Sequence, residues 1–267
     1  MHLLIDDTFA TRTLTHPIAT GEINPPAGLD VSLVPRLPPE MVGAQDAALI
    51  ASPAVLYLQD THLIAHEIAV VAQDTGAVAM RVPVRPDEIE ATPVRLLDTG
   101  LLAEWLARAL LQRFYGIEAT AWVRDDNDPA VARAEVVIVE GAEALREPEG
   151  GLSEDLVRAW YILHNQFLVS HLLLLPRNAG LSDVDQTLAF LAATRDAGLA
   201  SRRDWRPQQA EREDIVSARA GAFWSAQELS LADDDRDSLL LLLNEGRRGT
   251  SAPAPVHVDF REGTAAT

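Results

Sequence analysis

The sequence contains no cysteine and no lysine among its 267 residues. Without a thiol, the chain cannot use a cysteine nucleophile, a zinc–thiolate site, an iron–sulfur cluster or a disulfide framework. Without lysine, it cannot form a lysine Schiff base or use the lysine of a phosphate-binding loop. The motifs HExxH, GxSxG and GxGxxG are also missing, so these zinc, hydrolase and dinucleotide sites are not indicated.

Positive charge is scarce. The 22 arginines face 40 acidic residues, which gives a formal net charge of −18. Nonspecific binding to nucleic acid depends on neutralising phosphates, and docking on anionic membranes also needs basic residues. The charge balance therefore argues against both kinds of partner.

Long hydrophobic runs are missing too. The longest apolar stretches, such as Leu172 to Leu175 and Leu239 to Leu243, are far shorter than the roughly 20 residues that span a bilayer. At the N-terminus, Asp6 and Asp7 arrive before any long apolar stretch, and no basic segment precedes one. We therefore expect a cytoplasmic protein, the alternative being a signal peptide removed before residue 1.

Hydrophobic residues make up 48% of the chain and charged residues 23%, which is typical of a globular protein. Short apolar runs bounded by Pro, Gly and Asp predict strands that are covered on both faces. These predicted strands cover residues 3–5, 31–34, 47–51, 64–71, 78–82, 94–97, 119–123, 136–139 and 167–175.

The clearest predicted helix begins near residue 101. Its apolar residues from Leu101 to Phe114 recur at steps of three and four, so they share one face. Asp98 or Thr99 is a suitable N-cap for this helix, and Gly116 is a suitable C-cap. Other predicted helices cover residues 38–42, 156–163, 182–197 and 208–222, and a last one starts near residue 230 with three acids in its first turn.

Strands interleaved with helices predict an α/β fold with mainly parallel sheets and a C-terminal helical segment. We expect the chain to cross between two lobes near residues 92–93 and 164–165. Residues 1–91 and 168–249 would form the first lobe, residues 92–167 the second, and residues 250–267 a flexible tail. This order of elements resembles the type II periplasmic-binding-protein fold, which has a ligand cleft between its lobes.

Local motifs narrow the resemblance to one family. Residues 46–52 (DAALIAS), 110–117 (LLQRFYGI), 138–146 (IVEGAEALR) and 160–163 (WYIL) occur in that order. They are similar to the "DAALVSS", "LLxxFYGI", "LIGDEALR" and "WYEL" segments of the menaquinone-biosynthesis proteins of the futalosine pathway. That group includes chorismate dehydratase, and the likeness spans roughly residues 2 to 245.

The chain departs from this family at positions that carry polar groups. The family's "YLN" tripeptide after the first strand corresponds here to residues 7–11 (DTFAT), with neither Tyr nor Asn. A family serine falls near Ala77, and the family's "TPxSxTS" segment corresponds to residues 97–103 (LDTGLLA). The resemblance therefore implies the fold, whereas the reaction need not be shared.

In a two-lobed α/β protein, ligands bind at the carboxyl ends of strands and near helix N-termini, where backbone N–H groups favour anions. Asp7 and Glu140 are our candidates for a catalytic role. The candidate ligand-binding residues follow strands, open helices or lie at a crossing, and they are Asp6, Thr8, Ser52, Asp74, Thr75, Gly76, Thr99, Gly100, Gly141 and Asn165.

Each candidate also has a purely structural interpretation. Asp6 and Asp7 could form an Asx turn at a strand end, and Ser52 could be an N-cap. Thr99 caps a helix under either interpretation. Glu140 could cap the helix that follows it, or act as a general base if it is buried.

The histidines do not indicate a metal site. His62 and His66 would be neighbours on a helix, but on the predicted strand they lie about 13 Å apart. His164 and His171 lie in or near the second crossing, and we interpret them as core or hinge residues. We therefore expect no metal and no cofactor.

Two ligand-binding functions remain open at this point, beside a third possibility, an interaction protein with a degenerate cleft. The resemblance to chorismate dehydratase implies an enzyme that binds a small dicarboxylate and eliminates water. The missing Tyr, Asn and Ser positions favour instead a solute-binding or sensor protein that closes on a small anion without reacting it. In both cases the partner is a small anionic metabolite, a carboxylate, and assembly as a homodimer is left open.

Overall fold

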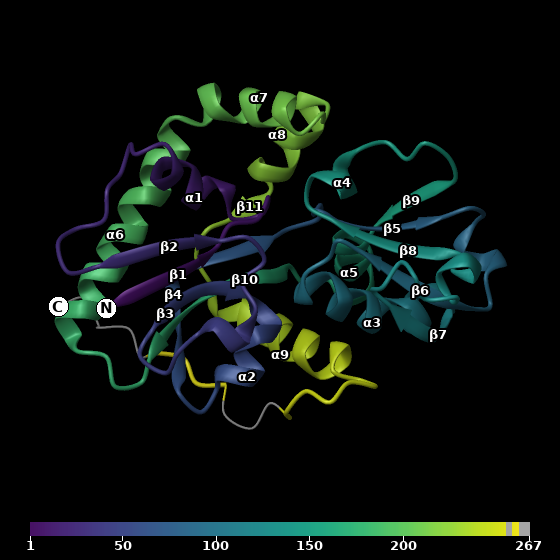
Figure 1. Cartoon of the computed structure of the whole chain (residues 1–267), viewed down its shortest axis with the longest axis horizontal. Coiled ribbons are helices and arrows are strands. Elements are labelled where there is room, and N and C mark those ends of the chain that lie inside the picture. Colours follow the sequence, from purple (N-terminus) through teal and green to yellow (C-terminus); the bar gives the residue numbers. More distant parts are fainter. Residues whose placement is uncertain (255–257, 262–267) are drawn as a thin grey trace.

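The computed structural model describes residues 1–254 and 258–261. Two sheets form the centres of two lobes, which lie side by side in Figure 1. The first sheet has six strands, in the order β11-β4-β10-β3-β1-β2, and the second has five, in the order β7-β6-β8-β5-β9. The two-lobed α/β fold expected from the sequence is confirmed.

The first sheet is assembled from both ends of the chain. Its parallel part pairs β1 with β2 and β3, and its antiparallel part pairs β10 with β3 and β4, and β11 with β4. The strands are β1 (His2–Asp6), β2 (Asp30–Val34), β3 (Ala47–Ala51), β4 (His62–Ala72), β10 (Leu168–Pro176) and β11 (Gln227–Glu228).

The second sheet comes from the middle of the chain. In it β6 pairs in parallel with β7 and β8, whereas β5 pairs antiparallel with β8 and β9. The strands are β5 (Val78–Val82), β6 (Ala91–Leu97), β7 (Glu118–Val123), β8 (Val136–Glu140) and β9 (Leu152–Asp155). Because β5 belongs here, the first crossing lies in residues 73–77 and not at the expected 92–93.

Both sheets are mixed, not mainly parallel as expected. The reason is the path of the chain, because each time it enters the other lobe it adds a strand that runs against its neighbours. Thus β10, which follows the second crossing, runs antiparallel to β3 and β4, and β5, which follows the first crossing, runs antiparallel to β8. Strand direction depends on this route, which apolar periodicity does not report.

Strand β10 is central in the first sheet, and all nine of its residues are buried. Its pairing with β4 shifts register between Val169 and His171. A register shift of this kind leaves one strand with an extra residue and turns the next side chain in a new direction. His171, described below, is the first residue of β10 that pairs with β4 after this shift.

The second lobe is covered by helix α3 (Leu101–Tyr115), whose buried stripe matches the predicted apolar face. The helix ends at Gly116, which has a left-handed φ of 75° that glycine adopts without steric cost. Helix α5 (Leu156–His164) packs beside it and precedes the second crossing. Helix α4 (Ala142–Leu145) is a single short turn after β8.

Helices also surround the first lobe. Helix α9 (Asp233–Gly246) carries the three predicted acids in its first turn, and it also contacts α3 of the other lobe. The predicted helix over 208–222 is in fact two, separated by Asp214 with its positive φ of 53°. The remaining helices are α1 (Arg12–Ala19), α2 (Val55–Leu58), α6 (Leu181–Ala200), α7 (Arg202–Arg212) and α8 (Ser217–Ser225).

Several elements lie outside the predicted ranges, among them α1, α2, α4, β9 and β11. Helix α1 contains Pro17 and several β-branched residues, so its helical propensity is low, and its packing against α6 compensates. Strands β9 and β11 have four and two residues, too few to show a period. β11 also corrects the expectation that the last third has no strand.

Part of the expected flexible tail is docked. Ile64 on β4 donates to the carbonyl of Asp259 at 2.9 Å, and Arg261 donates back to Ile64 at 2.8 Å. The guanidinium of Arg261 lies 2.7 Å from Glu67. Residues 258–261 therefore extend the sheet edge, while residues 255–257 and 262–267 lie outside the described part. In the described chain, no helix has the length and apolar character needed to cross a membrane.

Candidate functional site

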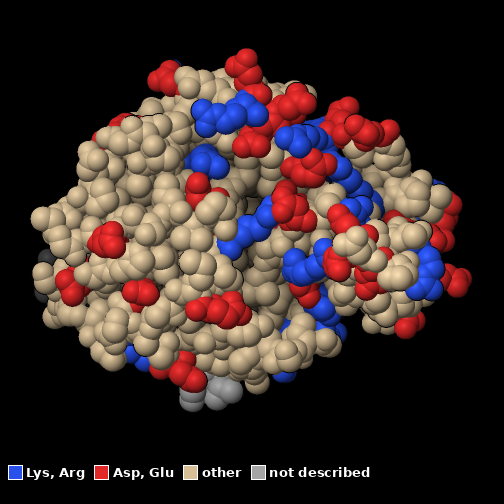
Figure 2. Space-filling model, in the orientation of Figure 1, with Lys and Arg blue, Asp and Glu red and all other residues tan. Residues whose placement is uncertain are grey.

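The cleft between the lobes holds two adjoining cavities, which share Thr8, Arg36 and Glu140. The first has a volume of about 450 Å³ and the second about 470 Å³. Both lie within the range of small-molecule sites. The space-filling view in Figure 2 shows a hollow between the two halves, with basic and acidic side chains beside one another along it.

The first cavity is lined by both lobes. From the first lobe come the ends of β1, β2 and β3, helix α2 and strand β10. From the second lobe come the start of α3, Arg124 after β7 and Glu140 at the end of β8. Its lining residues that carry polar side chains are Asp6, Thr8, Arg36, Glu40, Tyr57, Thr99, Glu104, Arg124, Glu140 and His171.

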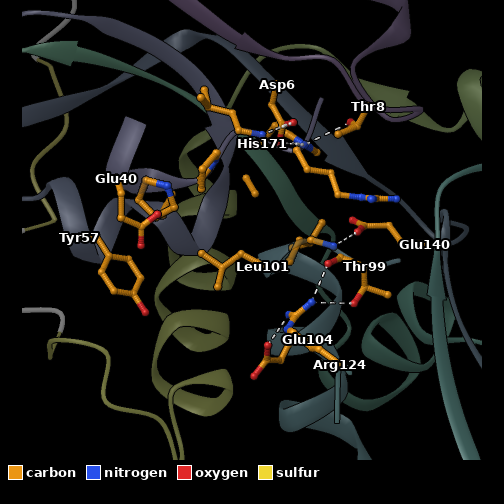
Figure 3. Close-up of a pocket in the computed structure, with 18 residues that line it drawn as sticks. Asp6, Thr8, Glu40, Tyr57, Thr99, Leu101, Glu104, Arg124, Glu140 and His171 are labelled. Carbon is orange, nitrogen blue, oxygen red and sulfur yellow. Dashed lines mark hydrogen bonds and ion pairs between the residues drawn. The ribbon is translucent and has the colours of Figure 1, made fainter. Parts of the chain in front are cut away.

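Asp6, at the end of β1, is 3% exposed and faces His171. One of its oxygens, Oδ1, accepts a hydrogen bond from Leu37 N at 3.0 Å, and the other lies 3.5 Å from His171 Nε2. The same ring nitrogen lies 3.5 Å from the hydroxyl of Thr8. These three residues form part of the first-lobe wall of the cavity (Figure 3).

The hydrogen bonds assign the tautomer of His171. The hydroxyl of Ser170 donates its one proton to the carbonyl of Val70 at 2.8 Å. It can therefore only accept from His171 Nδ1, which lies 3.1 Å away. In the neutral ring the Nδ1 atom then holds the proton, and Nε2 offers a lone pair at the cavity wall.

Glu140, at the end of β8, lies across the N-terminus of α3. Gly100 N donates to its Oε2 atom at 2.5 Å. Burial raises the pKa of Glu140, and the bond from Gly100 offsets only part of this effect. Gly100 is the N-cap of α3. A Cβ atom at this position would lie 3.1 Å from Glu140 Oε2, so a larger residue would crowd the carboxyl group. Asp98 and Thr99, the expected N-caps, provide no side-chain cap bond.

Arg124 follows β7 and reaches the same helix end. It donates to the carbonyl of Thr99 at 2.8 Å and to Glu104 at 2.5 Å. Glu104 also accepts two bonds from Arg108, at 2.8 and 2.9 Å. Burial acts to raise the pKa of Glu104, but the two arginines outweigh it and the pKa is lowered.

Arg36 and Asp98 connect the lobes by an ion pair across the cleft. Arg36 follows β2 and Asp98 follows β6. Both have left-handed backbones, with φ values of 53° and 51°, which few non-glycine residues adopt. The hydrogen bond from Arg36 lowers the pKa of Asp98. Both side chains are at least 44% exposed, so the pair contributes little to the free energy of unfolding.

The second cavity is bordered by paired charges. Asp7 accepts from the hydroxyl of Thr15 at 2.7 Å and from Arg12 at 3.1 Å. Arg146 donates to Glu143 at 2.8 Å and to the carbonyl of Glu213 at 2.6 Å. Asp7 is thereby held by its neighbours in the first lobe.

The structure brings many of the sequence candidates together. Asp6, Thr8, Thr99, Gly100 and Glu140 line the first cavity. Asp7 and Gly141 line the second.

Other candidates lie elsewhere. Ser52 is fully buried and donates to the carbonyl of Val169 at 2.7 Å. Thr75 donates to Asp155 at 3.1 Å, and Gly76 faces Val157 beside a space of about 30 Å³ behind Glu140. Asn165 ends α5 with a φ of 53°, outside both cavities. Asp74 lines neither cavity. Ser52, Thr75 and Asn165 thus have structural roles.

Sequence reasoning missed six polar residues of the first cavity, which are Arg36, Glu40, Tyr57, Glu104, Arg124 and His171. Arg36, Tyr57 and Arg124 line the first cavity from loops and a short helix with no distinctive motif. His171 was interpreted as a core or hinge residue, and it is 2% exposed, yet it lines the cavity as well. Positions after strand ends could have suggested Arg36 and Arg124, because they follow the strands ending at residues 34 and 123.

His62 and His66 both lie on β4, as the strand prediction required. The His62 ring contacts the carbonyl of Asp46 at 2.9 Å, and His66 lies 3.7 Å from Glu67. Over residues 1–254 and 258–261, no three His, Asp or Glu side chains are placed to hold a metal ion together.

No protein-family model and no curated protein sequence matches the chain. Solved structures do match it. Protein AF1704 from Archaeoglobus fulgidus aligns with a TM-score of 0.66 and 13% identity, covering 92% of this chain and 96% of the other. The periplasmic aliphatic sulphonate binding protein SsuA from Escherichia coli aligns with a TM-score of 0.61 and 11% identity, covering 100% and 97%.

The alkanesulfonate-binding protein SsuA from Xanthomonas axonopodis pv. citri, bound to MOPS, gives a TM-score of 0.61 and 12% identity, covering 90% of this chain and 89% of the other. At such identities these likenesses show the fold alone. The chain has the two-lobed periplasmic-binding-protein-like fold that its resemblance implied.

Proposed function

We propose that the chain binds a small organic acid in the first cavity, between its two lobes. The observation that carries this proposal is the convergence of Arg36, Arg124 and the N-terminus of α3 on one cavity of about 450 Å³. These cationic and N–H groups come from both lobes, although the whole chain carries a net charge of −18.

The start of α3 provides backbone donors for a carboxylate. The first N–H groups of a helix have no acceptor within the helix, and the helix dipole favours negative charge there. Gly100 N is already taken by Glu140, so a ligand carboxylate would meet the next groups, at Leu101 and Leu102. The sulphonate-binding proteins of the same fold support an acidic ligand, since a sulphonate and a carboxylate are both oxyanions.

Thermal unfolding of the purified chain in the presence of small acids tests the proposal. A panel of aliphatic and aromatic carboxylates and sulphonates should contain compounds that raise the Tm with increasing concentration. Arg124→Gln should weaken their binding by about ten-fold, which corresponds to one lost charged hydrogen bond.

Arg85→Gln is the matched control, because Arg85 is exposed and pairs with Asp87 on the second lobe, outside the first cavity. It should bind the same compounds as the original chain. Lack of any stabilising acid, or equal weakening by both variants, would reject the proposal.

A second candidate function is elimination of water from such an acid, as the resemblance to chorismate dehydratase implies. The specific observation is that Glu140 and His171 share the cavity in complementary states. Burial raises the pKa of Glu140 and so favours its protonated form, whereas the neutral ring of His171, with its proton on Nδ1, presents a lone pair at Nε2.

In this reaction, His171 takes a proton from the substrate carbon. The electrons of that C–H bond form a C=C bond, and the C–O bond to the neighbouring hydroxyl breaks. Glu140 donates a proton to the departing oxygen, so one water molecule is released. Proton exchange with solvent restores both residues.

Incubation with chorismate, followed by mass spectrometry, tests this second candidate. An enzyme would yield a product lighter by one water, and Glu140→Gln should lower the rate by about a hundred-fold or more. Binding of chorismate without any product would leave the binding function and exclude the elimination.

A further inference from the structure

The charges of the first cavity do not suit a ligand that is purely anionic. Of the described residues that line it, four are acidic (Asp6, Glu40, Glu104 and Glu140), two are arginines (Arg36 and Arg124), and one is His171. Arg36 pairs with Asp98, and Arg124 pairs with Glu104. Apart from these two ion pairs, the described wall carries the carboxyl groups of Asp6, Glu40 and Glu140 and the ring of His171.

The unpaired acids lie at different places around the cavity (Figure 3). In Figure 3, Asp6, Thr8 and His171 lie at one side of the space, and Thr99, Glu104 and Arg124 lie at the opposite side, with Glu140 beside them. One side offers the oxygens of Asp6 and Thr8. The other offers the N–H groups at the start of α3, with the carboxyl group of Glu140 next to them.

Several of these oxygens have acceptor capacity left. Asp6 Oδ2 has His171 as its one neighbour within ion-pair distance in the described chain, at 3.5 Å. The hydroxyl of Thr8 lies 3.5 Å from the same ring nitrogen, so the two oxygens are less than about 7 Å apart. For Glu140, no described residue bonds to Oε1, because its bond from Gly100 goes to Oε2.

An ammonium group matches this arrangement. It carries three N–H donors and one positive charge, whereas the cavity offers several acceptors and an excess of negative charge. A plain carboxylic acid would instead leave the buried carboxyl group of Asp6 with His171 as its one ion-pair partner among the described residues, which is unfavourable.

We infer that the ligand of the cleft is an amino acid, with its carboxylate at the start of α3 and its ammonium group between Asp6, Thr8 and Glu140. This inference rests on the proposed function and narrows it to zwitterionic acids. The rest of the wall includes Leu37, Pro38, Tyr57 and Leu101, so the ligand carries an apolar or aromatic side chain.

Calorimetric titration with matched pairs of compounds tests the inference. The probes are L-phenylalanine against 3-phenylpropionate, and L-leucine against 4-methylpentanoate. Each pair differs by the ammonium group alone. We expect at least one amino acid to bind about ten-fold or more tightly than its partner, because a charged hydrogen bond contributes roughly that much.

Two variants locate the ammonium group. Asp6→Asn keeps the oxygen that accepts from Leu37 but removes the charge, and Glu140→Gln keeps an acceptor for Gly100. In each variant, the amino acid should lose affinity until it binds about as tightly as the matched acid that lacks the ammonium group. That matched acid should still bind. Asp30→Asn is the control, since this exposed acid at the start of β2 lies outside the cavity.

Each result decides the inference. If 3-phenylpropionate and 4-methylpentanoate bind as tightly as the amino acids, the inference is wrong and the proposed function stands. If the preference exists but survives both Asp6→Asn and Glu140→Gln, the ammonium group is elsewhere and the inference is also wrong. If none of the four compounds binds, the inference is overturned. If the wider panel of acids also fails to bind, the proposed function falls with it.

Discussion

At the scale of single residues, the titration of Glu140 follows from its burial. The folded state raises its pKa above the ordinary glutamate value, mainly through desolvation. Between the unfolded and the folded pKa the native state therefore binds more protons than the unfolded state. Glu140 therefore contributes fully to the free energy of unfolding below the pKa that it has in the unfolded chain. This contribution is lost as the pH rises through the higher pKa that it has in the folded chain.

We therefore predict that Glu140→Gln removes the part of the fall in the free energy of unfolding with rising pH that is due to Glu140. The variant keeps an acceptor for Gly100 and cannot ionise. As the pH rises above the ordinary glutamate pKa, the variant should gain stability relative to the original chain, by up to roughly 1 to 3 kcal/mol, the scale of a buried group without full compensation. Urea unfolding at several pH values measures the difference. A difference that does not change with pH would contradict the prediction.

Asp155 shows how one carboxylate can organise several segments. Its oxygens accept bonds from Val157 N at 2.8 Å and Arg158 N at 3.1 Å, which cap α5. They also accept from Gly76 N and the hydroxyl of Thr75, both at 3.1 Å, in the first crossing between the lobes. One side chain thus connects a helix start to the crossing segment.

Asp155→Ala should lower the free energy of unfolding by about 2 kcal/mol or more, because it removes an N-cap and leaves further donors unpaired. Chemical denaturation measures this loss. Ser153→Ala is the control on the same strand, since Ser153 is exposed, and should change stability by less than about 0.5 kcal/mol. Equal effects of the two substitutions would show that the capping role is absent.

At the scale of elements, close packing sets the identity of one helical glycine. Gly198 on α6 faces α1, and a Cβ atom at this position would lie 1.9 Å from the carbonyl oxygen of Thr13. Gly221 on α8 has no atom within 4 Å of the corresponding position. Replacing Gly221 therefore changes helical propensity alone, whereas replacing Gly198 changes helical propensity and also introduces a steric clash.

We predict opposite effects of the same substitution. Gly221→Ala should stabilise the chain by up to about 1 kcal/mol through helical propensity. Gly198→Ala should destabilise it by about 1 kcal/mol or more, because α1 and α6 must move apart. Thermal unfolding measures both. Stabilisation by Gly198→Ala would show that the contact between α1 and α6 is looser than described.

Elements also show where sequence periodicity succeeds. It located α3 and most strands within a few residues, because their apolar patterns are regular. It joined α7 and α8 into one helix, because the left-handed Asp214 between them is a backbone feature without a turn signal in the sequence. Glycine or proline would have marked such a break, but aspartate also occurs within helices.

At the scale of the whole molecule, the ion pair between Arg36 and Asp98 joins the lobes across the cleft opening. Removing it should favour separation of the lobes, while the free energy of unfolding changes by at most about 1 kcal/mol because both side chains are exposed. Asp98→Asn is suited to this test, since asparagine tolerates the left-handed backbone.

Small-angle scattering of the ligand-free chain measures the effect. We predict a larger radius of gyration for Asp98→Asn than for the original chain, and a smaller difference at high salt, where the original pair is screened. Arg85→Gln removes an exposed ion pair within one lobe and should leave the profile unchanged. Identical profiles for all three proteins would show that the pair does not restrain the lobes.

The sequence by itself determined the α/β class, the two-lobed plan and several residues of the cleft, including Asp6, Thr8 and Glu140. These follow from local signals, because strands and helices show their apolar periods and ligand sites lie after strand ends. The tertiary structure alone decided the strand directions, the membership of β5 in the second lobe and the place of His171 in the cavity wall. Those depend on contacts between residues far apart in the chain, such as His171 with Asp6, and no local pattern encodes them.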